Sequence, residues 1–163
     1  MSKDKDTDNY KVVAQNKRAR FDYDLIEIIE AGIMLKGSEV KSLRLGKSSI
    51  NEAYIGEMTE EGADHCGLYL INATISEYAQ ANSFGHAEKR PRCLLVRKRQ
   101  MNKFLGSIRK KGMTVVPLRL YFNGKGIAKL EIALAKGRQT HDKRAAIKDR
   151  DWGREKARVL KGE

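Results

Sequence analysis

The chain has 163 residues and a formal net charge of +12, with 33 Lys and Arg against 21 Asp and Glu. The length favours one domain, and the charge favours a polyanionic partner, because each neutralised phosphate releases counterions. No apolar run approaches the roughly 18 residues of a membrane span, and the N-terminal MSKDKDTDNYK lacks the apolar segment of a signal peptide, so we expect a cytoplasmic protein that binds no membrane.

The charge is distributed unevenly along the chain. Residues 1–88 carry 10 basic and 15 acidic side chains, residues 89–131 carry 13 and 1, and residues 132–163 carry 10 and 5. Local ion pairs therefore cannot neutralise the cations of the middle segment. A solvated face is the usual explanation of such a run, but a segment this long without acid favours an anion-binding surface.

The start of the chain predicts a disordered head followed by a strand. Residues 1–13 are charged and lack periodicity, which is typical of disorder. The apolar residues between Phe21 and Ile33 suggest a strand with a bulge near Gly32, although a helix is also compatible with them.

A short helix is expected from Gly37. Ser38 is a suitable cap, Gly46 a suitable stop, and Val40 and Leu43 are three residues apart, so both would face the core.

The next segment predicts a hairpin, a loop and a short strand. Two strand-like runs, Ile50 to Met58 and Leu68 to Ile75, flank an acidic turn that contains glycine. Tyr78 to Arg92 has no periodicity and predicts a long loop, a type that often carries function. Cys93 to Val96 predicts a buried strand.

From Arg97 the pattern becomes helical. Met101, Phe104, Leu105 and Ile108 follow the spacing i, i+3, i+4, i+7, and basic residues surround them. One face of this helix should pack while the others carry positive charge.

The clearest hairpin pattern runs from Thr114 to Ala135. Apolar residues alternate on both arms, and Asn123 and Gly124 are expected to supply the positive φ angles of the turn. Pro117 cannot donate to a strand ladder, so we expect it at a strand edge or a bulge.

These elements predict a mainly β fold, a small antiparallel OB-like barrel with short flanking helices. The pattern alone does not distinguish this barrel from an open α+β sheet. We expect a disordered head at residues 1–13, an RNA-binding body at 14–137 and a basic tail at 138–163, which is too polar to fold around a core of its own.

Motifs of catalysis and metal binding are missing from the sequence. There is no Walker loop, HExxH or nucleophile elbow, and His65 and His86 have no partner at ligand spacing. Cys66 and Cys93 form no CxxC pair, so we expect two buried or half-buried thiols rather than a disulfide or a zinc site. We predict no enzymatic activity, no metal and no cofactor.

Five segments occur in a distinctive order: NKRARFDY, EAGIMLKGSEVKSLRLGKSSI, RPRCLLV, MTVVPLRLYFNGKGIAKLEIALAKG and HDKR. From about Asn16 onward the chain resembles the bacterial tmRNA-binding protein family of trans-translation, also called small protein B or SsrA-RNA-binding protein. The resemblance implies an OB-like barrel and a tail that is disordered in the free protein and helical on the ribosome. It also implies a cofactor-free protein that escorts alanyl-tmRNA, with elongation factor Tu, into the A site of a stalled ribosome.

The resemblance assigns Glu30, in the EAG motif, to the surface that holds the tRNA-like domain of tmRNA. A carboxylate that faces RNA must accept hydrogen bonds from base or ribose donors, because phosphate would repel it. The alternative is a structural salt bridge from Glu30 to Lys41 or Arg44.

Other expected RNA contacts follow from the same comparison of motifs. Leu95 and Arg97 follow the pattern of the family's RKLLL run and the position after it, but Cys93 stands where Lys is common and Arg97 where a neutral polar residue or His is frequent. The guanidinium of Arg97 could contact a phosphate instead. Each of the further contributors has the alternative of being only solvated: Asn16, Lys17, Arg18, Arg92, Lys129, Lys136 and Arg138.

In the tail, the resemblance assigns His141 to stacking on an rRNA base of the decoding centre, a role that suits a planar ring near neutrality. The tail then occupies the empty mRNA channel. The other tail residues implied in ribosome binding are Asp142, Lys143, Arg144, Ile147 and Trp152.

Two other classes of protein remain open at this point. An OB-type ribosomal or general single-strand RNA-binding protein would favour aromatic stacking platforms, and Tyr69, Tyr121 and Phe122 are few. A nuclease or RNA-modifying enzyme would need an acidic or metal constellation. The expected partners are tmRNA, the ribosome with its 16S rRNA decoding centre, and elongation factor Tu, and we expect a monomer.

Overall fold

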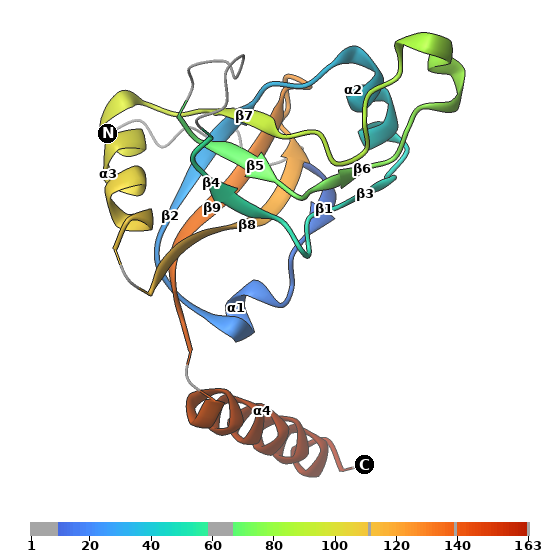
Figure 1. The fold of residues 1–163 in the computed structure, drawn as a ribbon. Helices are drawn as coiled ribbons and strands as arrows, with labels where there is room; N and C mark the ends of the chain where they lie inside the picture. The colour runs from blue at the N-terminus through green and yellow to red at the C-terminus, as the bar shows by residue number, and fades with distance from the viewer. Residues whose placement is uncertain (1–9, 59–66, 111, 139, 163) are drawn as a thin grey trace.

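A closed antiparallel barrel forms the body of the protein in a computed structural model (Figure 1). The structure describes residues 10–58, 67–110, 112–138 and 140–162, without the side chains of residues 82–84 and 140–142. The strands are β1 (Lys11–Gln15), β2 (Tyr23–Ile33), β3 (Ser48–Ser49), β4 (Tyr54–Gly56), β5 (Tyr69–Ile71), β6 (Thr74–Ile75), β7 (Arg92–Leu95), β8 (Met113–Phe122) and β9 (Ala128–Gly137). The helices are α1 (Ala19–Asp22), α2 (Gly37–Arg44), the 3-10 helix η1 (Ala79–Phe84), α3 (Lys98–Ile108) and α4 (Thr140–Leu160).

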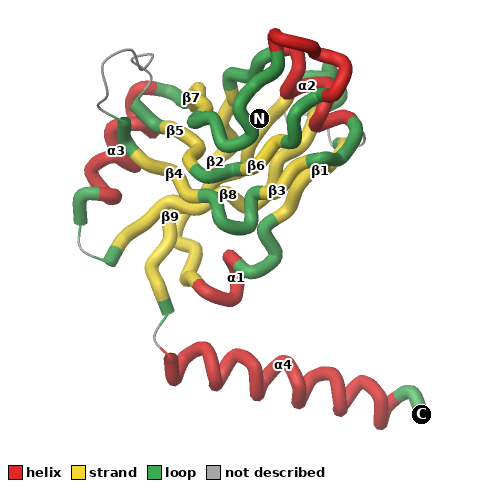
Figure 2. The backbone as a smooth tube through the Cα atoms, turned by 45° about the vertical axis from the view of Figure 1, so that its right-hand side comes forward, coloured by secondary structure: helices red, strands yellow, loops and turns green. Residues whose placement is uncertain are grey.

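The barrel closes because β9 pairs with both β2 and β8. The strand order is β1-β8-β4-β5-β7-β2-β9, with the additional β8–β9 pairing, and β3 and β6 form a separate two-stranded sheet. All of these pairings are antiparallel. The predicted mainly β barrel is confirmed, and the closure excludes the open α+β sheet. Figure 2 shows α4 below the strands, apart from the barrel.

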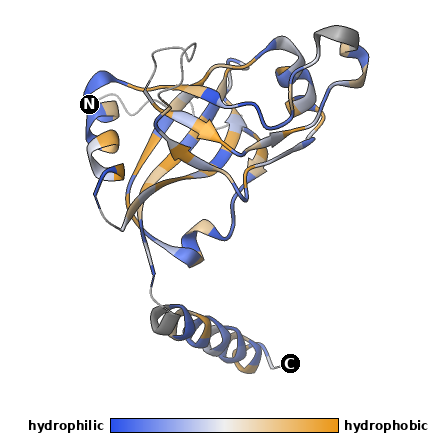
Figure 3. Ribbon diagram, in the orientation of Figure 1, coloured by the Kyte–Doolittle hydropathy of each residue, from blue (hydrophilic) through white to orange (hydrophobic). Residues whose placement is uncertain are grey.

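The core fills the barrel with the apolar residues that alternate along its strands. Leu120, Leu130 and Ile132 are almost fully buried, and Phe104 of α3 inserts among them from outside the sheet. Figure 3 shows the hydrophobic colour concentrated on the strands, whereas α4 is mostly hydrophilic. The predicted packing face of α3 is therefore confirmed, with Met101, Leu105 and Ile108 packed against the core.

The two long strands that close the barrel contain bulges. The register of β8 against β9 shifts just after Pro117, which confirms the bulge expected there. In β2 the shift lies between Leu25 and Glu27, so the bulge predicted near Gly32 is wrong. Gly32 instead allows β2 and β7 to lie close together, since a Cβ at this position would lie 3.1 Å from Leu95 Cβ on the neighbouring strand.

The turn between β8 and β9 is longer than the sequence suggests. It spans residues 123–127, and the residue with positive φ is Gly126, at +75°, rather than Asn123 or Gly124. The side-chain oxygen of Asn123 accepts hydrogen bonds from the backbone N–H groups of Lys125 and Ile127, at 3.1 and 2.9 Å. This asparagine organises the turn through its side chain instead of its backbone.

Helix α2 begins one position before the predicted cap. Its N-cap is Lys36, whose backbone N–H donates to Glu39 Oε2 at 2.8 Å, so Ser38 lies inside the helix and the prediction that it caps α2 is wrong. The Ser38 hydroxyl instead lies 2.9 Å from His86 Nδ1.

The sequence missed the short helix α1 and placed the head boundary too late. β1 already begins at Lys11, so the predicted disorder of residues 11–13 is wrong, and residues 1–9 lie outside the described chain. Ala19 of α1 packs on the outer wall of the barrel in a second apolar cluster with Val116, Leu118, Ala133 and Ala135. This cluster anchors α1 beside the end of β9.

The hairpin expected between residues 50 and 75 is present as the β4–β5 pair, with the β3–β6 pair beyond it. Its predicted acidic turn lies largely outside the described residues. The predicted long loop contains η1, and β7 begins at Arg92 instead of Cys93.

Cys93 is disulfide-bonded, so the expectation of a thiol is wrong for this residue. Sequence spacing does not determine which cysteines a barrel brings together; Cys66 lies outside the described residues. Across the described ranges, no helix is long and apolar enough to cross a membrane.

Candidate functional site

An open groove of about 840 Å³ lies between β2, β7 and the start of α3. Four residues that the sequence predicts as RNA contacts line it: Glu30 on β2, Leu95 on β7, Arg97 at the N-cap of α3 and Lys129 on β9. The strand pairing explains their convergence, because Gly32 pairs with Leu95 on one side and with Lys129 on the other. The elements around this groove can be followed in Figure 1.

The groove also contains residues that the sequence analysis missed, notably Ile28 and Gln100. Ile28 is 43% exposed and Leu95 is 55% exposed, so the groove has an apolar part that water contacts. Strand periodicity could have identified Ile28, since it stands two residues before Glu30 and therefore shares its face of β2.

Glu30 is half exposed and has two partners. The Tyr121 hydroxyl donates a hydrogen bond to Glu30 Oε2, and Lys129 Nζ lies 3.7 Å from Oε1. The alternative salt bridge to Lys41 or Arg44 is wrong, because the ion pair of Glu30 is with Lys129, while Lys41 and Arg44 lie over the rings of Tyr78 and Phe122. Glu30 is thus a carboxylate held in position at the surface, not a buried structural group.

The environment of Tyr121 keeps this phenol protonated. Burial raises the pKa of Tyr121 above the ordinary tyrosine value, and the hydrogen bond to Glu30 and its negative charge raise this pKa further. At neutral pH the hydroxyl is therefore a donor and Glu30 is its acceptor. One oxygen of Glu30 is oriented in this way, while the other faces Lys129.

Arg92, predicted as an RNA contact, is instead a structural residue. Its side chain has no exposed surface, and its Nε donates to Glu39 Oε1 at 2.9 Å. Its two terminal nitrogens donate to the carbonyl oxygens of Ala73 and Glu88, at 3.0 and 3.1 Å. Arg92 begins β7 with its side chain buried, so this structure leaves none of its surface for the RNA contact that the sequence predicts.

Glu39 is the centre of this buried network. Burial alone would raise the pKa of the Glu39 carboxyl, but hydrogen bonds from Arg90 and the Lys36 backbone and the charge of Arg92 outweigh burial and lower it. The carboxylate consequently stays ionised and balances Arg92, which a protonated Glu39 could not do.

Asn16 is also structural, because its side chain is buried and its Oδ1 accepts a hydrogen bond from the Ala19 N–H at 3.2 Å. This contact caps α1. Since 7% of the residue is exposed, little of Asn16 is available to RNA in this structure, and its predicted contact stays a prediction.

The remaining basic residues of the predicted surface lie at the other end of β9, around α1. Lys17, Arg18 and Lys136 are exposed there. Arg138 Nε donates to Asp24 Oδ1 at 2.8 Å, so its charge is already paired. The structure thus divides the predicted residues into two surfaces, the groove and the α1 end.

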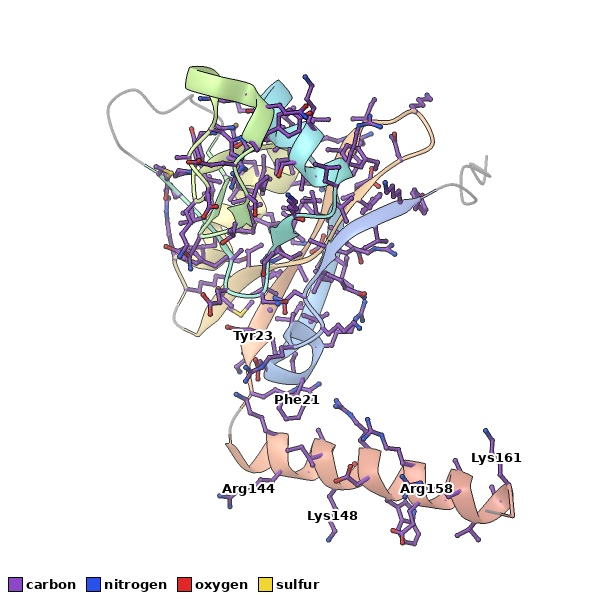
Figure 4. The ribbon with its side chains drawn as sticks, turned by 90° about the vertical axis from the view of Figure 1, so that its right-hand side faces the viewer. Phe21, Tyr23, Arg144, Lys148, Arg158 and Lys161 are labelled. Carbon is purple, nitrogen blue, oxygen red and sulfur yellow. The ribbon has the colours of Figure 1, made fainter. Side chains whose placement is uncertain are left out.

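Helix α4 contacts the body at α1. Lys143 Nζ lies 3.5 Å from Asp22 Oδ1, and the Arg150 guanidinium lies 5.4 Å from the centre of the Phe21 ring. Figure 4 shows Phe21 directed toward α4, whereas Arg144 projects from the opposite side of the helix. Most of the surface of α4 is left open to solvent.

The tail residues with described side chains are accessible. Ile147 is 44% exposed and Trp152 is 69% exposed, an unusual state for tryptophan in a free monomer. His141 and Asp142 lie in the first turn of α4, and their side chains are not described. The expectation that the free tail is disordered stays a prediction, although the structure has a helix here.

Folding pairs many cations of the middle segment, residues 89–131, with carboxylates. Carboxylates reach six of its 13 basic residues, and in five of these pairs the carboxylate comes from outside the segment. The pairs are Arg90 and Arg92 with Glu39, Lys103 with Glu27, Arg109 with Glu57, Arg119 with Glu131, and Lys129 with Glu30. Six others have no ion pair within the described chain: Lys89, Arg97, Lys98, Arg99, Lys110 and Lys125.

Three rings that the sequence offered as a stacking platform are buried: Tyr69, Tyr121 and Phe122. In the described body, Tyr54 on β4 and Tyr10 just before β1 are exposed, at 48% and 42%. His86 is buried between Ser38 and the carbonyl oxygen of Ile75, and no group of metal-ligating residues occurs in the described ranges.

A closed OB-like barrel with a cation-flanked surface groove and a basic terminal helix defines a class, the small nucleic-acid-binding barrel proteins. A family model described as SmpB protein matches residues 13–162. The chain belongs to the SmpB protein family, as its sequence motifs predict.

Individual relatives agree along nearly the whole chain. The SsrA-binding protein of Azorhizobium caulinodans is 55% identical over 151 residues, which cover 93% of this chain and 91% of that protein. The SsrA-binding protein of Rhodopseudomonas palustris is 54% identical over 158 residues, 97% of each. A similar solved structure is described as "tmRNA-SmpB: a journey to the center of the bacterial ribosome", with 41% identity and a TM-score of 0.60 over 77% of this chain and 84% of that one.

Proposed function

We propose that this chain binds the tRNA-like domain of tmRNA and acts in trans-translation. The names of its relatives and of the solved neighbour support this proposal. The structural observation that carries it is the groove at Glu30, because one surface there combines a carboxylate acceptor, two cations and exposed apolar side chains.

Each part of the groove suits a different part of RNA. Arg97 and Lys129 are cations for backbone phosphates, and Arg97 has no competing ion pair within the described residues. Leu95 and Ile28 give an apolar surface to the face of an unstacked base. Glu30 accepts hydrogen bonds from base or ribose donors and repels phosphate, so it selects how the strand lies.

The tail is the second part of the proposed function. We infer that α4 enters the decoding centre and the empty mRNA channel of a stalled ribosome, with His141 stacking on an rRNA base and Asp142 beside it. The exposure of Trp152 and Ile147 and the many basic residues of α4 support a binding partner for this helix.

Delivery to the A site follows from these two parts. In the proposal, elongation factor Tu carries alanyl-tmRNA while this protein, as a monomer, holds the RNA and needs no cofactor or catalytic group. A protein that acts on bacterial ribosomes in this way would be located in the cytoplasm.

A binding assay with a Glu30→Ala variant tests the proposed groove. We expect wild-type protein to bind the tRNA-like domain more tightly than an unrelated RNA of equal length, and Glu30→Ala to weaken this binding about tenfold, the loss of roughly one charged hydrogen bond. Filter binding beside thermal melting separates lost affinity from lost folding.

Glu52→Ala is a matched control, because Glu52 is an exposed carboxylate that does not line the groove. We expect it to bind like wild type. Sequencing of the RNA that copurifies with the protein is an independent test, and the absence of tmRNA from that RNA would contradict the proposed function.

A further inference from the structure

A second hollow adjoins the groove on another side of Glu30. It measures about 320 Å³ and is lined by Tyr10, Glu30, Asn123, Gly124 and Lys125. Glu30 lines both spaces, so a strand of RNA that passes over this carboxylate from the groove enters the second hollow.

The wall of this hollow is preformed. Asn123 accepts two hydrogen bonds from the backbone of its own turn, and its N–H donates to the carbonyl oxygen of Ile127 at 3.0 Å. Gly126 donates its N–H to the Asn123 carbonyl at 2.9 Å. These bonds fix the backbone on both sides of Lys125, so little ordering is required when a ligand arrives.

An aromatic ring forms the opposite wall. Tyr10 meets Tyr121 edge to face, with ring centroids 5.1 Å apart and planes at 75°, and Tyr121 in turn donates to Glu30. Tyr10 remains 42% exposed. The chain thereby holds a partly exposed aromatic ring at a set place relative to the Glu30 carboxylate.

The charge of the hollow has two signs. Lys125 is exposed and makes no ion pair within the described residues, so its amine is open to an anion. Among the described residues, the ion-pair partner of the Glu30 carboxylate is Lys129, whose Nζ lies 3.7 Å from Oε1. An acidic peptide would be repelled by Glu30, whereas a nucleotide offers hydroxyl donors to it and a phosphate to Lys125.

We propose that this hollow is a subsite for one unpaired nucleotide of the RNA strand that crosses the groove. The base stacks on Tyr10, the phosphate binds Lys125, and ribose or base donors bind Glu30. The inference rests on the proposed function for the identity of the RNA, but its geometry is separate from that of Leu95 and Arg97.

The test uses the full chain and the tRNA-like domain of tmRNA. We expect Tyr10→Ala to weaken binding about tenfold, because stacking on an aromatic ring contributes roughly 1–3 kcal/mol per base. Tyr10→Phe keeps the ring and should bind like wild type. Lys125→Met should weaken binding several-fold and reduce the slope of log affinity against log salt by about one.

Lys148→Met is the matched control, since it removes one exposed lysine from α4, away from the barrel (Figure 4). We expect its affinity and salt slope to match wild type. Thermal melting of each variant establishes that the barrel is folded.

The possible outcomes distinguish this inference from the proposed function. If wild-type protein binds tmRNA and Glu30→Ala weakens it, but Tyr10→Ala and Lys125→Met bind like wild type, the subsite is refuted and the groove stands. If Tyr10→Ala and Lys125→Met bind tmRNA like wild type but bind an acidic protein less tightly, the hollow is a protein-binding site and the nucleotide subsite is refuted. Failure of wild type to bind tmRNA would refute the proposed function itself.

Discussion

At the scale of single residues, two arginines of one motif have opposite roles. Arg92 and Arg97 stand five positions apart in a basic run, yet Arg92 is fully buried against Glu39 and Arg97 lines the groove. Strand alternation contained the signal, because Arg92 shares a face with the buried Leu94 and Leu95 points the other way. The missing information was the carboxylate that makes burial of Arg92 possible, which comes from α2.

Substitution of Glu39 tests the buried network. We expect Glu39→Gln to lower the free energy of unfolding by about 3–5 kcal/mol, since Arg92 would remain buried without a counter-charge. Urea unfolding at pH 7 measures the change. Glu57→Gln removes an exposed pair with Arg109 and should cost less than about 1 kcal/mol.

The pH dependence checks the same interpretation. Because the folded-state pKa of Glu39 is lowered, its contribution is complete above the ordinary glutamate pKa of about 4.3 and is lost as pH falls through the lower folded value. Wild type should therefore lose stability between pH 5 and 3 more steeply than Glu39→Gln. Parallel curves for the two proteins would mean that the pKa of Glu39 is the same in the folded and the unfolded chain.

At the scale of elements, the sequence predicted the types of the long elements and missed details that depend on tertiary contacts. The alternation of β8 and β9 and the apolar spacing of α3 are strong because one face of each packs on the core. The short helix α1 has no such pattern, since Asn16 and an apolar cluster on the barrel wall hold it. The sequence placed the positive φ angles of the turn after β8 at Asn123 and Gly124, but Asn-Gly is also compatible with the longer loop that the structure has.

The sequence and the structure differ on which glycine of this turn is the more sensitive to substitution by alanine: the sequence indicates Gly124 and the structure indicates Gly126. We expect Gly126→Ala to destabilise the protein by about 1–2 kcal/mol, because only Gly126 has positive φ and its site is otherwise roomy. Gly124→Ala should change stability by less than about 0.5 kcal/mol. Denaturant unfolding of both variants decides the point, and a larger effect at Gly124 would favour the two-residue turn.

At the scale of the whole molecule, the charge counted along the sequence differs from the charge that the folded surface presents. The middle segment has one acidic residue, Glu131, but folding brings carboxylates to six of its 13 basic residues, five of these from outside the segment. A count of charges along the sequence could not reveal these five pairs. The groove residues were found through family motifs, whereas Ile28 and Gln100 required the folded barrel.

Removal of the tail tests the division into body and tail. No α4 residue whose side chain the structure describes belongs to either apolar cluster, so a chain ending at Arg138 should fold with a melting temperature close to that of the full chain. We expect it to bind the tRNA-like domain within about twofold of wild type and to lose rescue of stalled ribosomes in a translation assay. Equal loss of RNA binding would show that the tail belongs to the binding surface of the body.

Strand β9 sets the distance between the groove and the start of α4. Lys129 lies in the groove and Gly137 ends the strand just before α4, so one continuous strand separates them by roughly 26 Å, at about 3.3 Å per residue. Pairing with β2 and β8 on its two edges keeps this strand from bending freely. An insertion or deletion within β9 would shift the starting point of the tail relative to anything held in the groove, even if every contacting side chain were kept.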